Sequence, residues 1–334
     1  MAKAKVFVTR VIPEAGLGKI REACDARVWE GRFPPPREVL LEQVRGMDGI
    51  LSLLNDRMDG AVMDAAGENL KTISNYAVGF DNIDVPAATS RGILVGNTPG
   101  AVTETTADLA FALIMAAARR LVEGVDFIRA GRWETFEPLV LLGRDVHGAT
   151  LGIIGMGRIG QAVARRARGF DMEIIYYHPR GETEAGGEAG ATWCGSLDGL
   201  LERSDFVSLH VPLNNETRHL IDGAALKKMK PSAILVNTAR GAVVDPEALY
   251  QALRDGVIAY AALDVTDPEP LPKDHKLMEL PNCLVVPHVG SASVATRERM
   301  AVMAAENLIA AVYGDIPRYV VNSEVLSRRR QRER

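Results

Sequence analysis

The segment LGIIGMGRIG, residues 151–160, constrains the fold of this chain more than any other stretch. A short apolar run leads into the pattern G-x-G-x-x-G, and a helix-forming segment, QAVARRARGF, follows it. In such a turn Gly155 allows the sharp reversal, Gly157 lets the backbone approach a pyrophosphate, and Gly160 lets the helix pack against the strand. The segment therefore predicts a dinucleotide-binding unit. The competing interpretation is a glycine-rich structural turn.

Short apolar runs surround this turn at the spacing of a doubly wound α/β sheet. Six of them follow one another from Thr150, separated by segments of helix or loop length. A helix over residues 292–313 and an extended segment, DIPRYVVNSEVL, are expected to close the chain. The six runs are LGIIG, EIIYY, FVSLHVP, AILVNT, YAALDV and LVVPH.

A second alternating series occupies residues 5–100, with strands expected at KVFVTR, GILSLL, LKTISNYAV and GILVGNTPG and a helix over residues 14–26. Short β-branched runs between helices are typical of a parallel sheet covered on both faces. Apolar residues at helical spacing from Ala107 to Leu121 predict one long helix with Thr103 as its N-cap.

A chain of 334 residues is also longer than one hydrophobic core usually allows. We therefore predict two Rossmann-like doubly wound α/β domains with a cleft between them. Residues 1–98 and 292–334 are expected to form a discontinuous, flavodoxin-like substrate domain, and residues 99–291 the dinucleotide-binding domain.

The composition excludes several functional classes. A net charge of −4 with 25% charged residues does not indicate a nucleic-acid binder, and no segment has the ~20 apolar residues of a membrane span. Three widely separated cysteines argue against a disulfide framework and a metal site, and they suit a reducing cytoplasm. The Arg-rich tail, residues 327–334, is predicted to be a solvated end, with an RNA or membrane-surface contact as the alternative.

The strand after the glycine turn ends in IIYYHPRG, without the acid that usually accepts the ribose hydroxyls of NAD. His178, Pro179 and Arg180 occupy that place. An arginine near the strand end favours a 2′-phosphate, which a carboxylate would repel. The segment therefore predicts that NADP(H) is favoured and NAD(H) possible. Alternatively, Arg180 is a solvated loop residue.

Several separated stretches together make the chain resemble the D-isomer-specific 2-hydroxyacid dehydrogenases, and within them the glyoxylate/hydroxypyruvate reductases. The resemblance covers nearly the whole chain and implies NAD(P)H-dependent reduction of glyoxylate to glycolate and of hydroxypyruvate to D-glycerate. The stretches are NYAVGFDNIDV (75–85), LGIIGMGRIG, HVPLNNET (210–217), LVNTARGAVVD (235–245), LDVTDPEPLP (263–272) and PHVGSAS (287–293).

The resemblance implies that Arg240, Glu269 and His288 are catalytic. A planar guanidinium suits the carboxylate and ketone of a 2-oxo acid. An imidazole can donate a proton near neutral pH, and a carboxylate at its other nitrogen favours the imidazolium and orients the ring. Taken singly, Arg240 could cap a strand end, Glu269 could be a surface charge, and His288 could be a hydrogen-bonded core residue.

The family also uses loop amides, here of Val78 and Gly79, for the substrate carboxylate, and a tight turn is the alternative for these residues. For Asp264, expected near the nicotinamide carboxamide, the alternative is a buried carboxylate that satisfies loop amides. The glycine turn and the end of the next strand predict cofactor contacts at Gly155, Gly157, Gly160, His178, Pro179 and Arg180. The further cofactor contacts that the resemblance implies are Thr106, Arg158, Ile159, Pro212, Thr217, Thr238, Ala239, Arg240, Asp264, His288 and Gly290.

One departure concerns the segment WETFEPLVLLG, residues 133–143, which looks like a loop that presents a Trp to the neighbouring subunit in animal hydroxypyruvate reductases; here Val140 follows Pro138-Leu139. Trp133 or Phe136 could take the place of that Trp beside the substrate, although packing in the core or at an interface would also explain these two residues. The long helix from Thr103 matches the element through which the family dimerises, so a homodimer is expected. The alternative functions are a 3-phosphoglycerate or other D-2-hydroxyacid dehydrogenase and a nucleotide-sensing corepressor.

Overall fold

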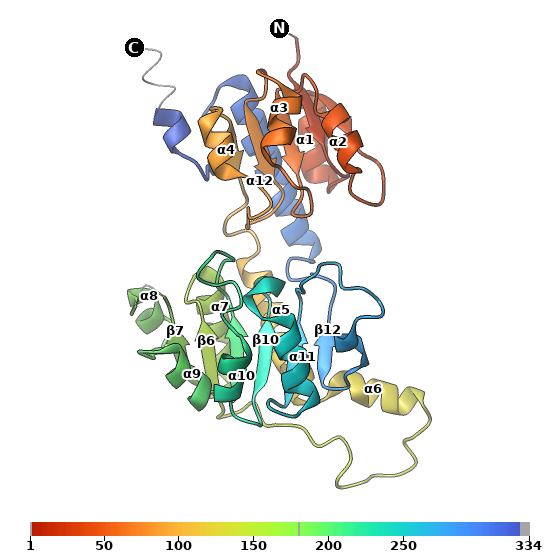
Figure 1. Cartoon of the computed structure of the whole chain (residues 1–334), viewed down its shortest axis with the longest axis vertical. Coiled ribbons are helices and arrows are strands. Elements are labelled where there is room, and N and C mark those ends of the chain that lie inside the picture. Colours follow the sequence, from red (N-terminus) through yellow and green to blue (C-terminus); the bar gives the residue numbers. More distant parts are fainter. Residues whose placement is uncertain (1, 180, 328–334) are drawn as a thin grey trace. The chain divides into compact units, whose positions relative to one another are not determined.

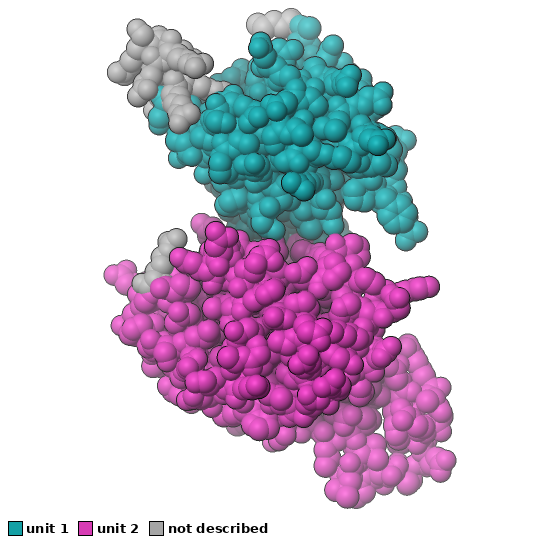
Figure 2. Space-filling model, in the orientation of Figure 1, with its two compact units in different colours: residues 1–102, 292–334 teal, residues 103–291 magenta. Residues whose placement is uncertain are grey.

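The structure is a computed structural model that describes residues 2–179 and 181–327, and the chain forms two compact units (Figure 1). Residues 1–102 and 292–334 make up the first unit and residues 103–291 the second (Figure 2). Arg180 and residues 328–334, which include most of the Arg-rich tail, lie outside the described residues. No helix of the described part of the chain is both long and apolar enough to cross a membrane.

The first unit contains a five-stranded parallel sheet in the order β2-β1-β3-β4-β5. This strand order is that of the flavodoxin-like doubly wound fold, as predicted. Buried side chains such as Phe7, Ile50 and Ile73 pack against α2, α3 and α4 on one face, whereas α1 and α12 pack against each other and α12 covers β3, β4 and β5. The strands are β1 (Lys5–Val8), β2 (Asp25–Val28), β3 (Gly49–Ser52), β4 (Thr72–Asn75) and β5 (Leu94–Gly96); the helices are α1 (Glu14–Ala23), α2 (Arg37–Gln43), α3 (Gly60–Ala66), α4 (Val85–Ser90) and α12 (Val294–Tyr313).

The prediction of one helix over residues 14–26 is wrong at its end. The helix α1 stops at Ala23, and Asp25–Val28 forms the edge strand β2 beside β1. The side chains of β2 are exposed or only half-buried. An edge strand of this kind lacks the apolar run by which the other strands of the unit were recognised.

The second unit contains a seven-stranded parallel sheet in the order β12-β11-β10-β9-β6-β7-β8. Six of these strands match the predicted runs, and the seventh, β8, has two residues and pairs only at the edge with β7. The strands are β6 (Thr150–Ile154), β7 (Glu173–Tyr177), β8 (Thr192–Trp193), β9 (Phe206–Leu209), β10 (Ile234–Asn237), β11 (Tyr260–Leu263) and β12 (Cys283–Val285); the helices are α5 (Thr103–Ala118), α6 (Leu121–Arg129), α7 (Arg158–Ala167), α8 (Glu184–Glu188), α9 (Leu197–Arg203), α10 (Gly223–Lys228) and α11 (Pro246–Arg254).

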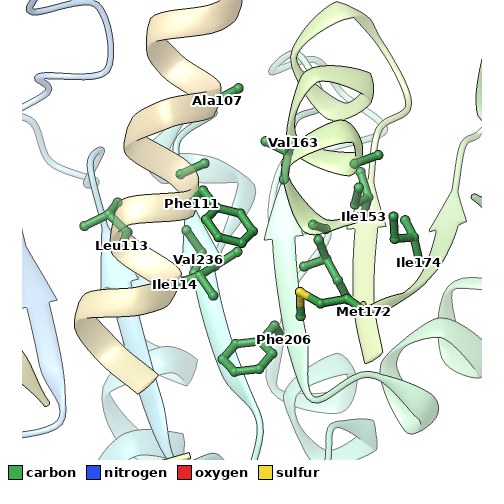
Figure 3. Close-up of a cluster of buried hydrophobic side chains, with 14 of the residues drawn as sticks. Ala107, Phe111, Leu113, Ile114, Ile153, Val163, Met172, Ile174, Phe206 and Val236 are labelled. Atoms are coloured by element: carbon green, nitrogen blue, oxygen red, sulfur yellow. The ribbon is translucent and has the colours of Figure 1, made fainter. Parts of the chain in front are cut away.

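The helices α5 and α7 cover one face of this sheet, with Phe111, Ile114 and Val163 turned toward Ile153 and Val236 of the strands (Figure 3). The opposite face carries a second apolar cluster, which α9, α10 and α11 cover. Because both faces are buried, the central strands are continuous apolar runs, which is why the sequence marks them clearly.

The predicted single helix from Thr103 to Leu121 is two helices. Thr103 is the first residue of α5, which ends at Ala118, and α6 begins at Leu121 after Arg120 in a left-handed conformation with φ 50°. The apolar face of α5 is buried in the second unit, from Ala107 to Ala117. None of the residues of α6 is buried.

Candidate active site

The predicted functional residues of the second unit lie at the carboxyl edge of its parallel sheet. His178 follows β7, Gly155 and Gly157 follow β6, Pro212 follows β9, Arg240 follows β10, Glu269 follows β11 and His288 follows β12. Because all strands run in the same direction, their carboxyl ends share one edge, which is where ligands of open α/β sheets bind.

His288 and Glu269 form a direct pair at the ends of the neighbouring strands β12 and β11. The Nδ1 atom of the imidazole lies 2.6 Å from Oε1 of Glu269. Both side chains are about one quarter exposed, so the pair is shielded but remains reachable from solvent. Since Nδ1 is engaged, Nε2 is the ring nitrogen that can exchange a proton with a bound molecule.

A buried carboxylate holds the backbone on either side of His288. Asp264 accepts hydrogen bonds from the amides of Val289 at 2.6 Å and Gly290 at 2.8 Å, and its carbonyl accepts from the amide of His288. Asp264 is 2% exposed, and burial raises the pKa of its carboxyl group. Asp264 is therefore a buried carboxylate that satisfies loop amides, which was the alternative role that the sequence left open for it. These bonds hold the loop while His288 has a φ of 51°.

Asn237, at the end of β10, is a residue that the sequence analysis missed. Its Oδ1 accepts from the amide of Ala239 at 3.0 Å and its Nδ2 donates to the carbonyl of Arg240 at 2.9 Å. Such a turn-forming asparagine at the end of an apolar strand is a signal that the sequence does contain. Gly241 completes the arrangement, because a Cβ there would lie 2.0 Å from the carbonyl of Thr266. The half-buried Arg240 therefore lies in a braced turn that packs on the segment leading to Glu269.

The glycine turn has the local geometry that its sequence predicts. Gly155 has a φ of 100°, and a Cβ there would lie 2.7 Å from the backbone of His210. A Cβ on Gly160 would lie 2.3 Å from the carbonyl of Gly155. A Cβ on Gly157 would meet nothing within 4 Å, so this position faces open space. The amino end of α7, with Arg158 and Ile159, follows directly. These residues therefore fit a dinucleotide pyrophosphate.

His210, which the sequence analysis did not single out, packs beside this turn. Burial lowers the pKa of its imidazole to about 3, so the ring is neutral near physiological pH. The hydroxyl of Ser208 lies 2.8 Å from Nε2. The backbone of His210 thus forms one wall of the glycine turn, and its ring does not carry charge there.

Three predicted threonine contacts have different surroundings. The hydroxyl of Thr238 is buried and has no hydrogen-bond partner among the described residues. An unpaired buried hydroxyl is expected where a bound ligand supplies the partner atom. The hydroxyl of Thr217 instead braces its own loop by donating to the carbonyl of Pro212 at 2.6 Å, and that of Thr106, on α5, donates to the carbonyl of Gly290 at 3.1 Å.

The segment expected to select the dinucleotide follows β7. His178 is half-buried, Pro179 is exposed, and the amide of Gly181 donates to the carbonyl of His178 at 2.9 Å. Arg180 lies between them, outside the described residues. The preference for NADP(H) accordingly rests on the sequence.

In the first unit, Val78 and Gly79 lie in the loop after β4, half-buried at the carboxyl edge of that sheet. The carbonyl of Val78 accepts from Asn97 Nδ2 at 2.8 Å, and that of Gly79 accepts from Asn75 Nδ2 at 2.9 Å. Both carbonyls therefore accept hydrogen bonds from side chains of the first unit.

Exposed apolar side chains concentrate on α6 and the segment after it. Trp133 is 67% exposed and Phe136 86%, so neither packs into the core of the second unit. Val140 is half-buried. The exposed apolar set consists of Leu121, Val122, Val125, Ile128, Trp133, Phe136, Leu139 and Leu142.

Comparisons with known proteins cover nearly the whole chain. The model of the family "D-isomer specific 2-hydroxyacid dehydrogenase, NAD binding domain" matches residues 111–290. A glyoxylate reductase of Korarchaeum cryptofilum is 54% identical over 325 residues, 97% of each chain, and one of Thermococcus litoralis is 50% identical over 97% of this chain and 98% of its own.

Two solved structures extend the comparison. A Thermus thermophilus protein has a TM-score of 0.89 at 48% identity, over 95% of this chain and 99% of its own. The NADPH-dependent glyoxylate/hydroxypyruvate reductase of Sinorhizobium meliloti, in complex with NADP and malonate, has a TM-score of 0.85 at 33% identity, over 96% of this chain and 97% of its own.

Proposed function

The chain belongs to the D-isomer-specific 2-hydroxyacid dehydrogenases, and from this premise we propose that it reduces glyoxylate and hydroxypyruvate, with His288 as the proton donor. The enzyme is thus an oxidoreductase of 2-oxo acids with a nicotinamide dinucleotide cofactor. The observation that carries the proposed mechanism is the 2.6 Å pair between His288 and Glu269.

In the proposed reaction the ketone carbon gains a hydride and the ketone oxygen gains a proton. A reduced nicotinamide dinucleotide, when bound, would supply the hydride. The imidazolium of His288 donates its Nε2 proton to the oxygen and becomes neutral, and Glu269 stabilises the charged ring before transfer and keeps it oriented. Arg240 polarises the ketone and binds the carboxylate with its planar guanidinium. We assign binding of the substrate carboxylate to the amides of Val78 and Gly79, and thus the substrate role to the first unit.

The cofactor residues proposed from the glycine turn are Gly155, Gly157 and Gly160, with the amides of Arg158 and Ile159. The open space beside Gly157 and the unpaired hydroxyl of Thr238 support this assignment. We propose NADPH as the preferred cofactor because His178-Pro179-Arg180 replaces the usual acid. The Sinorhizobium meliloti reductase is NADPH-dependent.

We also propose that the enzyme is a homodimer in the cytoplasm. The expected dimerisation helix, α5, has its apolar face buried within the second unit, so the exposed apolar residues of α6 and residues 133–142 support the proposal instead. Exposed apolar patches of this kind mark interaction surfaces. The free thiols of Cys24, Cys194 and Cys283 suit a reducing compartment.

The experiment that tests the function is a set of initial-rate measurements with glyoxylate, hydroxypyruvate and 3-phosphohydroxypyruvate, each with NADH and NADPH. The proposal expects turnover of the first two, with the higher kcat/KM for NADPH. The variants His288→Ala and Arg240→Ala should lose several orders of magnitude in turnover while binding the cofactor almost as well as the wild type. Wild-type rates in either variant would contradict the mechanism, and cofactor binding without reduction of any 2-oxo acid would indicate a sensing protein.

A further inference from the structure

Three successive carbonyl groups in the loop after β4 are each held by a donor of the same unit. The carbonyl of Ala77 accepts from the amide of Thr98 at 2.9 Å. Those of Val78 and Gly79 accept from the side-chain amides of Asn97 and Asn75, at 2.8 and 2.9 Å. The donors come from the end of β4 and the segment after β5, two neighbouring strands.

Because the peptide bond is planar, the direction of each held carbonyl also fixes the direction of the N–H group of the next residue. In a trans peptide the N–H of one residue points opposite to the C=O of the residue before it. Holding the carbonyls of Ala77, Val78 and Gly79 therefore turns the N–H groups of Val78, Gly79 and Phe80 away from these donors. None of these three amides donates to an acceptor within the described part of the chain. Consecutive free amides of this kind bind anions.

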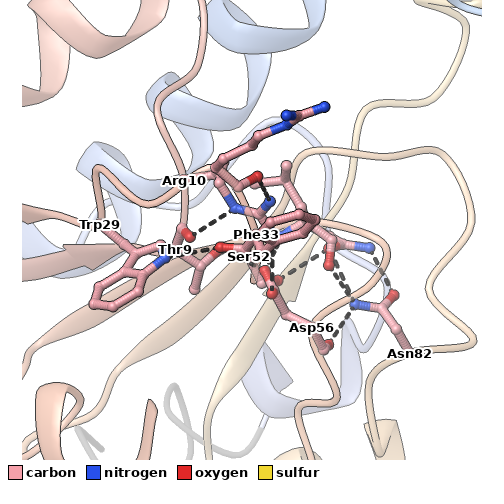
Figure 4. A network of polar contacts seen from close by, with 10 residues as sticks. Thr9, Arg10, Trp29, Phe33, Ser52, Asp56 and Asn82 are labelled. Carbon is pink, nitrogen blue, oxygen red and sulfur yellow. Dashed lines mark hydrogen bonds and ion pairs between the residues drawn. The ribbon is translucent and has the colours of Figure 1, made fainter. Parts of the chain in front are cut away.

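The orientation of Asn75 is itself fixed by a polar network. Asn75 is fully buried, its Oδ1 accepts from the hydroxyl of Ser52 at 2.9 Å, and its Nδ2 also lies 3.0 Å from Oδ1 of Asn82. Asn82 in turn donates to the carbonyls of Leu53 and Asp56, both at 3.0 Å (Figure 4). The network links the ends of β3 and β4, so the side chain of Asn75 cannot rotate without breaking several bonds.

We infer that Asn97 and Asn75 are positioning residues. By holding the carbonyl of Val78, Asn97 aims the amide of Gly79 at the carboxylate of the substrate. By holding the carbonyl of Gly79, Asn75 aims the amide of Phe80, which adds a third donor to the amides of Val78 and Gly79. This inference rests on the proposed function, which places that carboxylate at this loop. Asn97 is half-buried and its side chain donates to Val78, so it can be changed with less disturbance than the fully buried Asn75.

The test uses the full-length protein loaded with NADPH, or with NADH if that binds more tightly, and oxamate as a non-reacting analogue of a 2-oxo acid. Oxamate affinity is measured by calorimetry, and glyoxylate kinetics are measured in parallel. Asn97→Ala removes the donor, the nearly isosteric Asn97→Asp replaces it by an acceptor, and Asn97→Gln keeps an amide. Asn282→Ala is the matched control, because Asn282 is also half-buried and donates to two backbone carbonyls, those of Leu253 and Ala259.

The expected result is a roughly tenfold increase in the oxamate Kd and the glyoxylate KM for Asn97→Ala and Asn97→Asp, since the loss of one hydrogen bond and the mobility it releases are together worth about one decade of affinity. The kcat should fall much less, the cofactor Kd should not change, and Asn97→Gln should recover part of the affinity. Asn282→Ala should leave the oxamate Kd as in the wild type.

Unchanged oxamate affinity in both donor-less variants, or an equal loss in Asn282→Ala, overturns the inference. So does a wild type that binds no oxamate. A wild type that binds oxamate but reduces neither glyoxylate nor hydroxypyruvate contradicts the proposed function, whereas the positioning role is then decided by the oxamate affinities alone.

Discussion

The Nδ1 atom of His288 lies 2.6 Å from Oε1 of Glu269, although the two residues are 19 positions apart in the chain. The pair forms because β11 and β12 are neighbours in the sheet and end at the same edge. Asp264 holds the amides that follow His288, so the imidazole has a fixed backbone as well as a fixed partner.

Changing Glu269 separates orientation from charge. Glu269→Gln keeps an oxygen that can accept from Nδ1 but removes the negative charge, whereas Glu269→Ala removes both. We expect kcat for glyoxylate to fall in both variants, within the range of roughly 10²–10⁴ that general acid catalysis contributes, with the larger loss in Glu269→Ala. Single-turnover kinetics would measure this. Equal rates in wild type and Glu269→Ala would exclude a role for the carboxylate.

The glycine turn allows a test in which binding and stability respond separately. Gly157→Ala adds a methyl group in open space, so it should leave the unfolding free energy almost unchanged but weaken cofactor binding by about tenfold, the value of one lost charge-assisted hydrogen bond. Gly160→Ala places a Cβ 2.3 Å from the carbonyl of Gly155 and should cost about 1–3 kcal/mol of stability, as overpacking does. Urea denaturation and cofactor fluorescence titration check both, and a reversed pattern would contradict the assignment.

The buried Asp56 should make the stability of the first unit depend on pH. Burial raises the pKa of its carboxyl group, although bonds from Thr9 and from the amide of Leu53 oppose this. The folded state therefore holds the proton more tightly than the unfolded chain, so Asp56 contributes stability that is complete below about pH 3.9 and is lost as the pH rises through the folded pKa. The unfolding free energy of wild type minus that of Asp56→Asn should increase as the pH falls from 7.5 toward 4.

Asp59 provides a control of opposite sign in the same unit. Burial by itself would raise the pKa of Asp59, but hydrogen bonds from Arg37 and from the amide of Val62 lower it below its ordinary value. Its contribution is present above the unfolded pKa and is lost as the pH falls through the folded one. The difference between wild type and Asp59→Asn should thus decrease on acidification, and a common trend for both aspartates would refute the sign for Asp56.

Arg180 should determine which dinucleotide the enzyme prefers. If its guanidinium binds a 2′-phosphate, Arg180→Ala should raise KM for NADPH by about tenfold or more and leave KM for NADH nearly unchanged, since a hydrogen bond between charged groups is worth roughly 1.5–3 kcal/mol. The exposed Arg132 gives a matched control as Arg132→Ala. Equal changes in both Michaelis constants would show that Arg180 does not bind the 2′-phosphate, and would favour the alternative that it is a solvated loop residue.

A charge in the apolar surface of α6 should separate the proposed dimer. Leu121 is 55% exposed and Ile128 59%, and they lie two turns apart on this helix. Ile128→Glu would bury a carboxylate at the interface, so we expect a monomer by analytical ultracentrifugation at protein concentrations where the wild type is dimeric. Phe33→Glu, a change at an exposed apolar residue of the first unit, should remain dimeric. A monomeric wild type would refute the proposal.

The candidate site shows which features a sequence can predict. The turn at Gly155, the apolar strands and the motif positions of Arg240, Glu269 and His288 are local patterns, and each is visible in a few consecutive residues. The supporting bonds are not. Asn237, the last residue of β10, braces the backbone around Arg240, and Asn97, which follows β5, holds the carbonyl of Val78. The sequence marks both as polar residues at strand ends but does not reveal the carbonyls to which they donate.

The sequence by itself determined the doubly wound class, the place of the glycine turn and the family, because apolar period, turn glycines and motif order are encoded along the chain. The pairing of His288 with Glu269 was implied by the resemblance, and the tertiary structure shows it. Only the tertiary structure decided that Asp264 satisfies two amides, that α5 is buried while α6 is exposed, and that edge strands exist at residues 25–28 and 192–193. These features depend on which strands become neighbours and on which groups each strand end then brings within hydrogen-bonding distance, and that is settled by long-range packing.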